Sequence, residues 1–62
     1  SRMLILTSRV FDGPIHFVDN NTGIEHSIDI LEVKGGQVKI GFNIPDNITV
    51  LRDRVYQEQF ND

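Results

Sequence analysis

The strongest structural signal in the chain is the sequence VKGGQVKIGFNIP, which occupies residues 33–45. Its Gly35-Gly36 pair predicts a two-residue hairpin turn, because glycine readily adopts the positive φ angles that such turns require. A long strand at residues 24–34 would then pair with the strand that follows, and Pro45 would end that second strand because it has no N–H to donate. The turn fixes the expected cross-strand pairs, which are Val33 with Val38, Leu31 with Ile40, Asp29 with Phe42 and, on the opposite face, Glu32 with Lys39.

Apolar or alternating runs on either side of this hairpin predict three further strands. They occupy residues 3–7, with residues 9–11 as an extension, residues 15–18 and residues 48–51. Clusters of turn-forming residues separate them at 12–14, 19–23 and 46–47. In the strand at residues 15–18, Ile15 and Phe17 are expected on one face and His16 and Val18 on the other.

The end of the chain predicts a short helix. Asp53 is a suitable N-cap, and the helix is expected to run from Arg54 to about Phe60. Val55 and Tyr56 should face the sheet, because a helix this short is not stable alone. The fold class is therefore mainly β, with five short strands and a short C-terminal helix.

The chain has 62 residues, which is one domain at most. A core of this size is marginal, and the absence of cysteine excludes disulfides and thiolate zinc sites. Oligomerisation is therefore the expected source of additional stability. The lack of cysteine fits a reducing compartment, and we expect neither a transmembrane span nor a signal peptide. We interpret Ser1 and Arg2 as residues left by cloning, and Met3 as the natural start of a single domain at residues 3–62.

Residues suited to catalysis are few. Ser8 and Ser27 are the only serines after Met3, and neither has a base at a recognisable spacing. The carboxylates are scattered, and so short a chain has little room for a cleft that would hold two of them. We therefore expect that the protein is not an enzyme.

Two histidines leave two interpretations open. The loop at residues 19–23 could bring the strands of His16 and His26 side by side, and Glu25 or Asp29 could then complete a metal site. The alternative, which we favour, is a pair of solvent-facing histidines on a hairpin, because nothing in the sequence identifies a third ligand.

The formal net charge of −3 counts against a non-specific nucleic-acid binder, which usually has a broad basic face. Any RNA contact would have to depend on a few well-placed cations. Arg9 follows the first predicted strand and Arg52 follows the fifth. If these strands are neighbours, in one chain or across a dimer, the two arginines would form a small basic patch suited to phosphate, guanine and stacked bases. The alternative is two unrelated surface arginines.

Three segments in the same order resemble the carbon storage regulator family (CsrA/RsmA). The opening MLILTSRV, residues 3–10, is similar to the family's MLILTRRV. Residues 33–45 resemble its central VKGNQVRIGVNAP block, and VLRDRVYQ, residues 50–57, resembles its VHREEIYQ segment. Together these segments cover most of the chain.

The resemblance implies an intertwined homodimeric β-sandwich or barrel, in which the first and fifth strands of opposite chains lie side by side. It also implies a post-transcriptional regulator in the bacterial cytoplasm that binds GGA motifs in mRNA leader hairpins and controls translation or mRNA stability. Small decoy RNAs would be further partners. The resemblance implies no catalysis, no cofactor and no metal.

The resemblance also implies an RNA-binding surface that both chains share. Arg52 corresponds to the family's most important arginine, and we expect it to contact guanine or phosphate. Backbone groups around Thr7 and Val50 would read base edges. The complete set is Leu6, Thr7, Ser8 and Arg9 from one chain, with Ile44, Pro45, Val50, Leu51 and Arg52 from the other.

The chain departs from the family pattern at several positions. Ser8 stands where the family usually has arginine, Leu51 where it often has histidine, and Phe11-Asp12 where it has Gly-Glu. The hairpin around residues 19–23 is longer than in the usual family member. The missing cation at Ser8 would remove about one phosphate contact per site. The alternative function is a divergent paralogue with weak RNA binding, which acts through a regulatory protein partner or mixed dimers.

Overall fold

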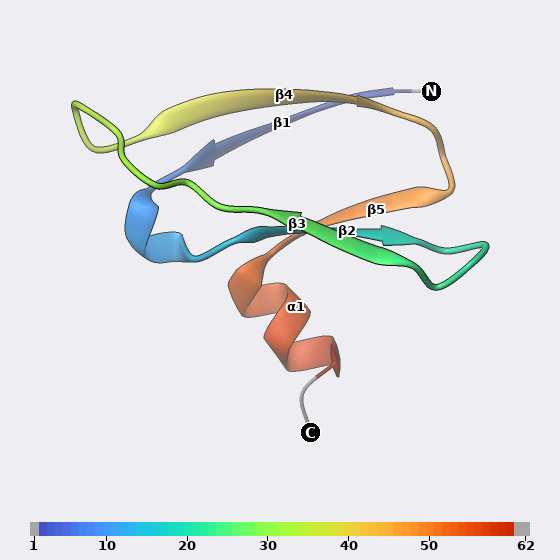
Figure 1. The fold of residues 1–62 in the computed structure, drawn as a ribbon. Helices are drawn as coiled ribbons and strands as arrows, with labels where there is room; N and C mark the ends of the chain where they lie inside the picture. The colour runs from blue at the N-terminus through green and yellow to red at the C-terminus, as the bar shows by residue number, and fades with distance from the viewer. Residues whose placement is uncertain (1, 61–62) are drawn as a thin grey trace.

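The structure, a computed structural model, describes residues 2–60, and they form two β-sheets and a C-terminal helix (Figure 1). The first sheet pairs β1 with β4, and the second has the order β3-β2-β5. A short 3-10 turn, η1, follows β1. The elements are β1 (Arg2–Ser8), η1 (Val10–Asp12), β2 (Ile15–Asp19), β3 (Glu25–Ile28), β4 (Val38–Ile44), β5 (Ile48–Arg52) and α1 (Asp53–Phe60). The predicted mainly-β class is confirmed.

The hairpin predicted around Gly35-Gly36 is wrong in its pairing. Both glycines have positive φ, 94° and 93°, and residues 34–36 do form a turn. However, β3 ends at Ile28, and β4 pairs with β1 rather than with residues 29–33. Instead of the predicted pairs, Ile40 lies opposite Leu6, Phe42 opposite Leu4 and Lys39 opposite Thr7.

The physical reason is the composition of the two candidate partners of β4. On one face β1 presents leucines opposite the large apolar residues of β4, whereas residues 29–33 carry Asp29 and Glu32. Pairing with β1 therefore covers more apolar surface. Leu31, which the predicted hairpin placed opposite Ile40, is 86% exposed.

In the second sheet the predicted hairpin is confirmed, but its second strand, β3, ends at Ile28 instead of continuing to residue 34. The predicted loop at residues 19–23 connects β2 to β3, and the two strands are antiparallel. Asp19 accepts a hydrogen bond from the backbone N–H of Asn21 at 3.0 Å, and the side-chain amide of Asn47 donates to the same carboxylate at 3.2 Å. These bonds join the loop to the turn before β5, which pairs along the other edge of β2.

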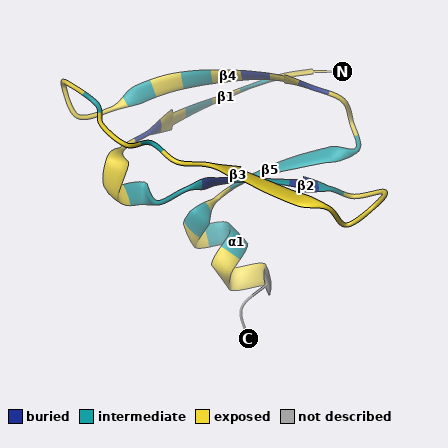
Figure 2. Cartoon of the chain, in the orientation of Figure 1, coloured by how far each residue is buried: buried dark blue, intermediate teal, exposed yellow. Residues whose placement is uncertain are grey.

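The core lies between the two sheets, and Figure 2 shows how few residues of the strands are fully buried. Ile15, Phe42 and Ile44 form its centre. The rings of Phe17 and Phe42 meet edge to face across the sheets, with centroids 5.3 Å apart. Partly buried residues that surround this centre are Leu4, Leu6, Phe17, Ile40, Ile48 and Val50. So small a core makes the fold of a single chain marginal.

Helix α1 packs on the face of β2 and β5 that points away from the first sheet (Figure 1). This is the face of His16 and Val18, so both faces of β2 are covered, and Val18 is only 8% exposed. The predicted inward orientation of Tyr56 is confirmed, because its ring stacks on that of His16. No helix among residues 2–60 has the length and apolar character that crossing a bilayer requires.

The predicted extension of the first strand through residues 9–11 is wrong. Val10–Asp12 form the 3-10 turn η1, because Asp12 and Arg9 bond to one another twice. The Arg9 N–H donates to the Asp12 carboxylate at 2.8 Å, and the Asp12 N–H donates to the Arg9 carbonyl at 3.0 Å. Arg9 N–H is thereby satisfied without a strand partner, and the chain turns toward β2.

Candidate nucleic-acid interface

The carboxyl ends of β1 and β5 meet, although the two strands belong to different sheets. The Arg52 guanidinium donates from Nη1 to the Thr7 carbonyl oxygen at 2.8 Å. Arg52 is exposed, and this single bond leaves most of the donors of its guanidinium fork for a ligand. Arg9 is also exposed and lies two residues beyond Thr7. The structure thus brings Arg9 and Arg52 to the same end of the molecule within one chain.

A depression of about 310 Å³ adjoins Arg52, and Arg54 from the first turn of α1 lines it as well. Asp12 and Val55 complete its lining. Arg54 is also within 3.7 Å of Glu58 one helical turn later, a pair that is largely exposed and therefore weak. Arg9, Arg52 and Arg54 lie at this end, and we refer to them as the arginine group; Lys39, opposite Thr7, adds a fourth cation nearby.

The other expected contact residues are partly in the core, and two of them lie far from the arginine group. The side chains of Leu6, Ile44 and Val50 belong to the core between the sheets. Pro45 is exposed, and Leu51 is half-buried. The register pairs Arg2 with Ile44 and Ser8 with Val38, so Ile44 and Pro45 lie at the far end of β1 from Ser8. At about 3.3 Å per residue, roughly 20 Å separates these ends. One chain alone therefore does not bring Ile44 and Pro45 to the arginine group.

Ser8 is the one buried polar side chain among the residues described, with 2% of its surface exposed. Its position follows from strand alternation, because Leu4, Leu6 and Ser8 share the inward face of β1. Thr7 and Arg9 lie outside. An arginine at position 8 would have to bury its charge or leave this face, so the substitution affects packing as well as charge.

A polar cluster anchors α1 directly after Arg52. His16 Nε2 lies 2.8 Å from Asp53 Oδ1, and the His16 ring stacks on Tyr56 at 3.7 Å between centroids. Tyr56 in turn donates its hydroxyl hydrogen to the Glu25 carboxylate on β3. We refer to His16, Asp53, Tyr56 and Glu25 as the His16 cluster. It fixes the start of the helix and therefore the position of the neighbouring Arg52.

Hydrogen bonds within this cluster shift two ionisation equilibria. The bond to His16, followed by that from Gln57, holds the pKa of Asp53 below its ordinary value. The bond to Glu25 raises the pKa of Tyr56 above its ordinary value, because losing the proton would break that bond beside a carboxylate. The two pKa shifts favour an ionised Asp53 and a protonated Tyr56, and these are the forms whose hydrogen bonds hold α1 on the sheet.

The preferred interpretation of two solvent-facing histidines is wrong for His16, whose side chain is 12% exposed. His26 is exposed on β3, where it pairs with Phe17 rather than with His16. Within residues 2–60 no three His, Asp or Glu side chains lie close enough to hold a metal ion. The sequence did contain a signal for the cluster: Asp53 and Tyr56 are three residues apart and share one face of the helix.

The chain is similar to a known protein family. A family model described as CsrA, a global regulator protein family, matches residues 3–60. The matched range includes all of the arginine group and of the His16 cluster. The comparison with solved structures found no match for the chain.

Proposed function

Because the chain belongs to the CsrA family of global regulators, we propose that it binds GGA motifs in mRNA leader hairpins and so controls translation or mRNA stability. Members of this family are post-transcriptional regulators that generally bind RNA, and the family is not one of enzymes. The proposal extends this description to a motif, to small decoy RNAs as competing partners and to Arg52 as the main contact.

The observation that carries the proposal is the exposed Arg52, held against the end of β1 by the Thr7 carbonyl. A guanidinium fixed in this way is suited to a bidentate contact with guanine or phosphate. Arg9 and Arg54 lie at the same end and supply further positive charge. The net charge of −3 implies that binding depends on these few cations and on base recognition.

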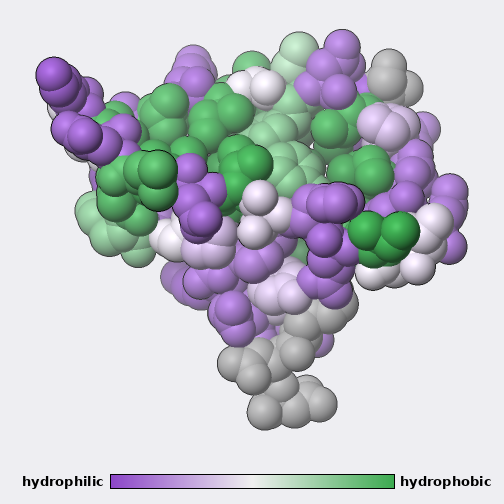
Figure 3. Space-filling view, in the orientation of Figure 1, coloured by the Kyte–Doolittle hydropathy of each residue, from purple (hydrophilic) through white to green (hydrophobic). Residues whose placement is uncertain are grey.

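Strand edges and exposed apolar residues support an intertwined homodimer as the active form. One edge of β1 and one edge of β5 have no partner strand within the chain. Met3 and Ile5 on β1 are 61% and 56% exposed, and Figure 3 shows apolar side chains over the part of the molecule that β1 and β4 form. A second copy that added strands to these edges would pair their open backbone groups, and packing between the two copies would cover exposed apolar residues such as these. The second copy would also bring its own Ile44 and Pro45 to the arginine group of the first, which the first chain's Ile44 and Pro45 do not reach.

The test is a titration of the protein with a short hairpin RNA that has GGA in its loop, beside a hairpin with a scrambled loop. We expect nanomolar binding that requires the GGA, and Arg52→Ala should weaken it by roughly five- to 150-fold. Arg52→Lys is the matched variant, because it keeps the positive charge and removes the bidentate fork.

Circular dichroism and sedimentation should show that both variants remain folded and keep the oligomeric state of the parent. Equal affinity of Arg52→Ala and the parent protein would contradict the assignment of Arg52. Weak binding that does not depend on the loop would contradict the RNA-regulator proposal itself.

The second candidate function is that of a paralogue that acts mainly through a protein partner or mixed dimers. Two observations favour it, the acidic net charge and the buried Ser8 where the family usually has arginine. It predicts a folded dimer with weak RNA binding, and co-purification from cells that yields protein without RNA.

A further inference from the structure

Phe11 has 82% of its surface exposed, which is unusual for an aromatic side chain in a protein with so small a core. It is not a mobile tail residue, because it occupies the centre of η1. The reciprocal bonds between Arg9 and Asp12 close this turn on both sides of it. The ring is therefore presented to solvent from a fixed backbone.

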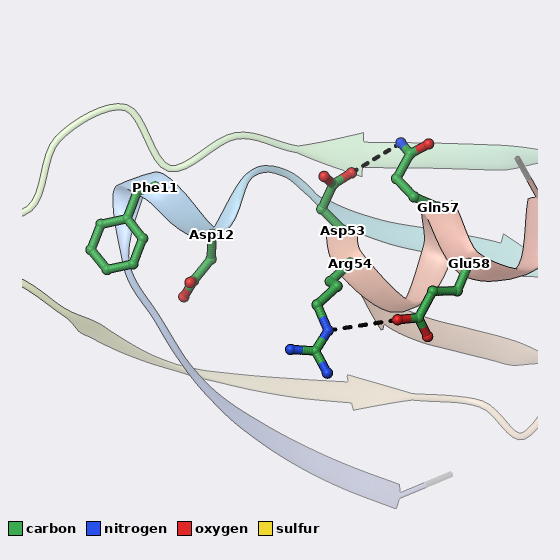
Figure 4. A pocket seen from close by; sticks show the side chains of 6 residues that line it. All are labelled: Phe11, Asp12, Asp53, Arg54, Gln57 and Glu58. Atoms are coloured by element: carbon green, nitrogen blue, oxygen red, sulfur yellow. Dashed lines mark hydrogen bonds and ion pairs between the residues drawn. The ribbon is translucent and has the colours of Figure 1, made fainter.

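Phe11 lies between Arg9 and a depression whose lining includes Arg54 and the carboxylates of Asp12, Asp53 and Glu58. The Arg9 guanidinium carbon lies 6.0 Å from the centre of the ring, within the range of a cation–π contact. On the other side a depression of about 660 Å³ runs from Phe11 to the first turns of α1. In Figure 4 the Phe11 ring, the Asp12 carboxylate and the Arg54 guanidinium all project to the same side of the chain.

This depression adjoins the one beside Arg52, because Asp12 and Arg54 line both. An RNA strand held by Arg52 could thus continue past Arg54 to Phe11. Of the other carboxylates along the way, Asp53 bonds to His16 and Glu58 forms a weak, exposed pair with Arg54. Asp12 lies beside the ring and accepts the Arg9 N–H with Oδ2, and its other carboxylate oxygen can accept a hydrogen bond from the amino group of a base.

We propose that Phe11 is a base-stacking platform that binds one unpaired nucleotide next to the GGA motif. Aromatic side chains stack on splayed-out bases in single-stranded loops, and flanking arginines hold the adjacent phosphates. The inference rests on the proposed function, which it extends by one nucleotide. Phe11 stands where the resembling family usually has glycine, so the platform is a feature of this chain.

The test uses GGA-loop hairpins with and without an unpaired nucleotide on each side of the motif. With the longer loop, Phe11→Ala should weaken binding by roughly five- to 150-fold. Removing the flanking nucleotides should weaken the parent protein to the same extent and leave Phe11→Ala unaffected. Leu31→Ala is the control, because Leu31 is an equally exposed apolar residue outside the depression.

A second variant detects the stacking directly. The chain has no tryptophan, so Phe11→Trp introduces a single fluorophore at the platform. We expect it to retain parental affinity and to be quenched on binding the longer loop, whereas Leu31→Trp should not be quenched.

The outcomes separate this inference from the proposed function. If the parent binds GGA RNA specifically and Phe11→Ala binds it with unchanged affinity, the stacking role of Phe11 is refuted and the proposed function stands. The exposed ring would then be assigned to contact with a protein partner. Dissociation of the dimer by Phe11→Ala would assign the ring to the subunit interface and would also overturn it. Failure of the parent protein to bind GGA RNA would refute both.

Discussion

Replacing Gly13 by alanine should destabilise the protein far more than the same change at Gly23. Gly13 has φ 81° and ψ −175°, a region that is essentially restricted to glycine. Forcing alanine into it costs about 1–3 kcal/mol. A Cβ atom there would also lie 2.9 Å from Asp53 Oδ2 and 3.0 Å from Asp53 Cβ, and such crowding adds about 1–3 kcal/mol.

Gly23 is the matched control, because its φ of 77° is similar and a Cβ there would meet nothing within 4 Å. Gly23→Ala should therefore cost only about 1–2 kcal/mol of conformational strain. At roughly 4–8 °C per kcal/mol, the two variants should differ by several degrees or more in Tm. Thermal unfolding must be compared at one protein concentration, since a dimer is stabilised by mass action.

Combining Gly13→Ala with Asp53→Ala isolates the contact with the helix. Removing the Asp53 carboxylate eliminates its nearest contact with the added methyl group, so the double variant should lose less stability than the sum of the two single variants. Strictly additive losses, or equal losses in Gly13→Ala and Gly23→Ala, would refute the close approach between the turn and α1.

Three further predictions concern the core and the His16 cluster. Ser8→Arg should lower Tm without tightening RNA binding, because it places a charge on a buried face; tighter binding by an equally stable variant would contradict this. Phe42→Ala should cost about 3–5 kcal/mol, comparable to the whole stability of so small a domain, so native-like circular dichroism at room temperature would argue against the core described here. The single tyrosine, Tyr56, should titrate by tyrosinate absorbance above its ordinary pKa of 10.0 and return toward it in Glu25→Gln. Because its folded-state pKa is raised, Tyr56 contributes stability below pH 10.0 and loses it as the pH rises through that higher value, a loss that should be absent from Tyr56→Phe.

Local sequence patterns were sufficient for most of the strands. The apolar opening, the alternation at β2, the turn before β5 and Asp53 at the start of α1 each lie where the sequence predicts them. The pairing of β4 was not predictable in the same way. A Gly-Gly turn indicates a local hairpin, but the choice of partner depends on the apolar surface that distant residues offer, here Leu4 and Leu6.

For the candidate site, strand alternation is sufficient to predict that the Ser8 side chain is buried. Ser8 follows Leu4 and Leu6 at a spacing of two, which indicates an inward side chain. The exposure of Phe11 could not be inferred, because it depends on the hydrogen bonds that convert residues 10–12 into a turn. The meeting of Arg52 and Thr7 likewise requires the stacking of the two sheets, which no local pattern reports.

The antiparallel pairing of β1 with β4 affects how the protein folds. The two strands are far apart in the sequence. Their pairing therefore closes a long loop, and the entropy of closing it is lost before stabilising contacts form. Such non-local pairing is slow, whereas the hairpin of β2 and β3 can form early from neighbouring residues. Until β1 docks, its apolar side chains and open edge are available to another chain. Folding of one chain and association of two would then compete for the same strand, so the refolding rate should depend on protein concentration.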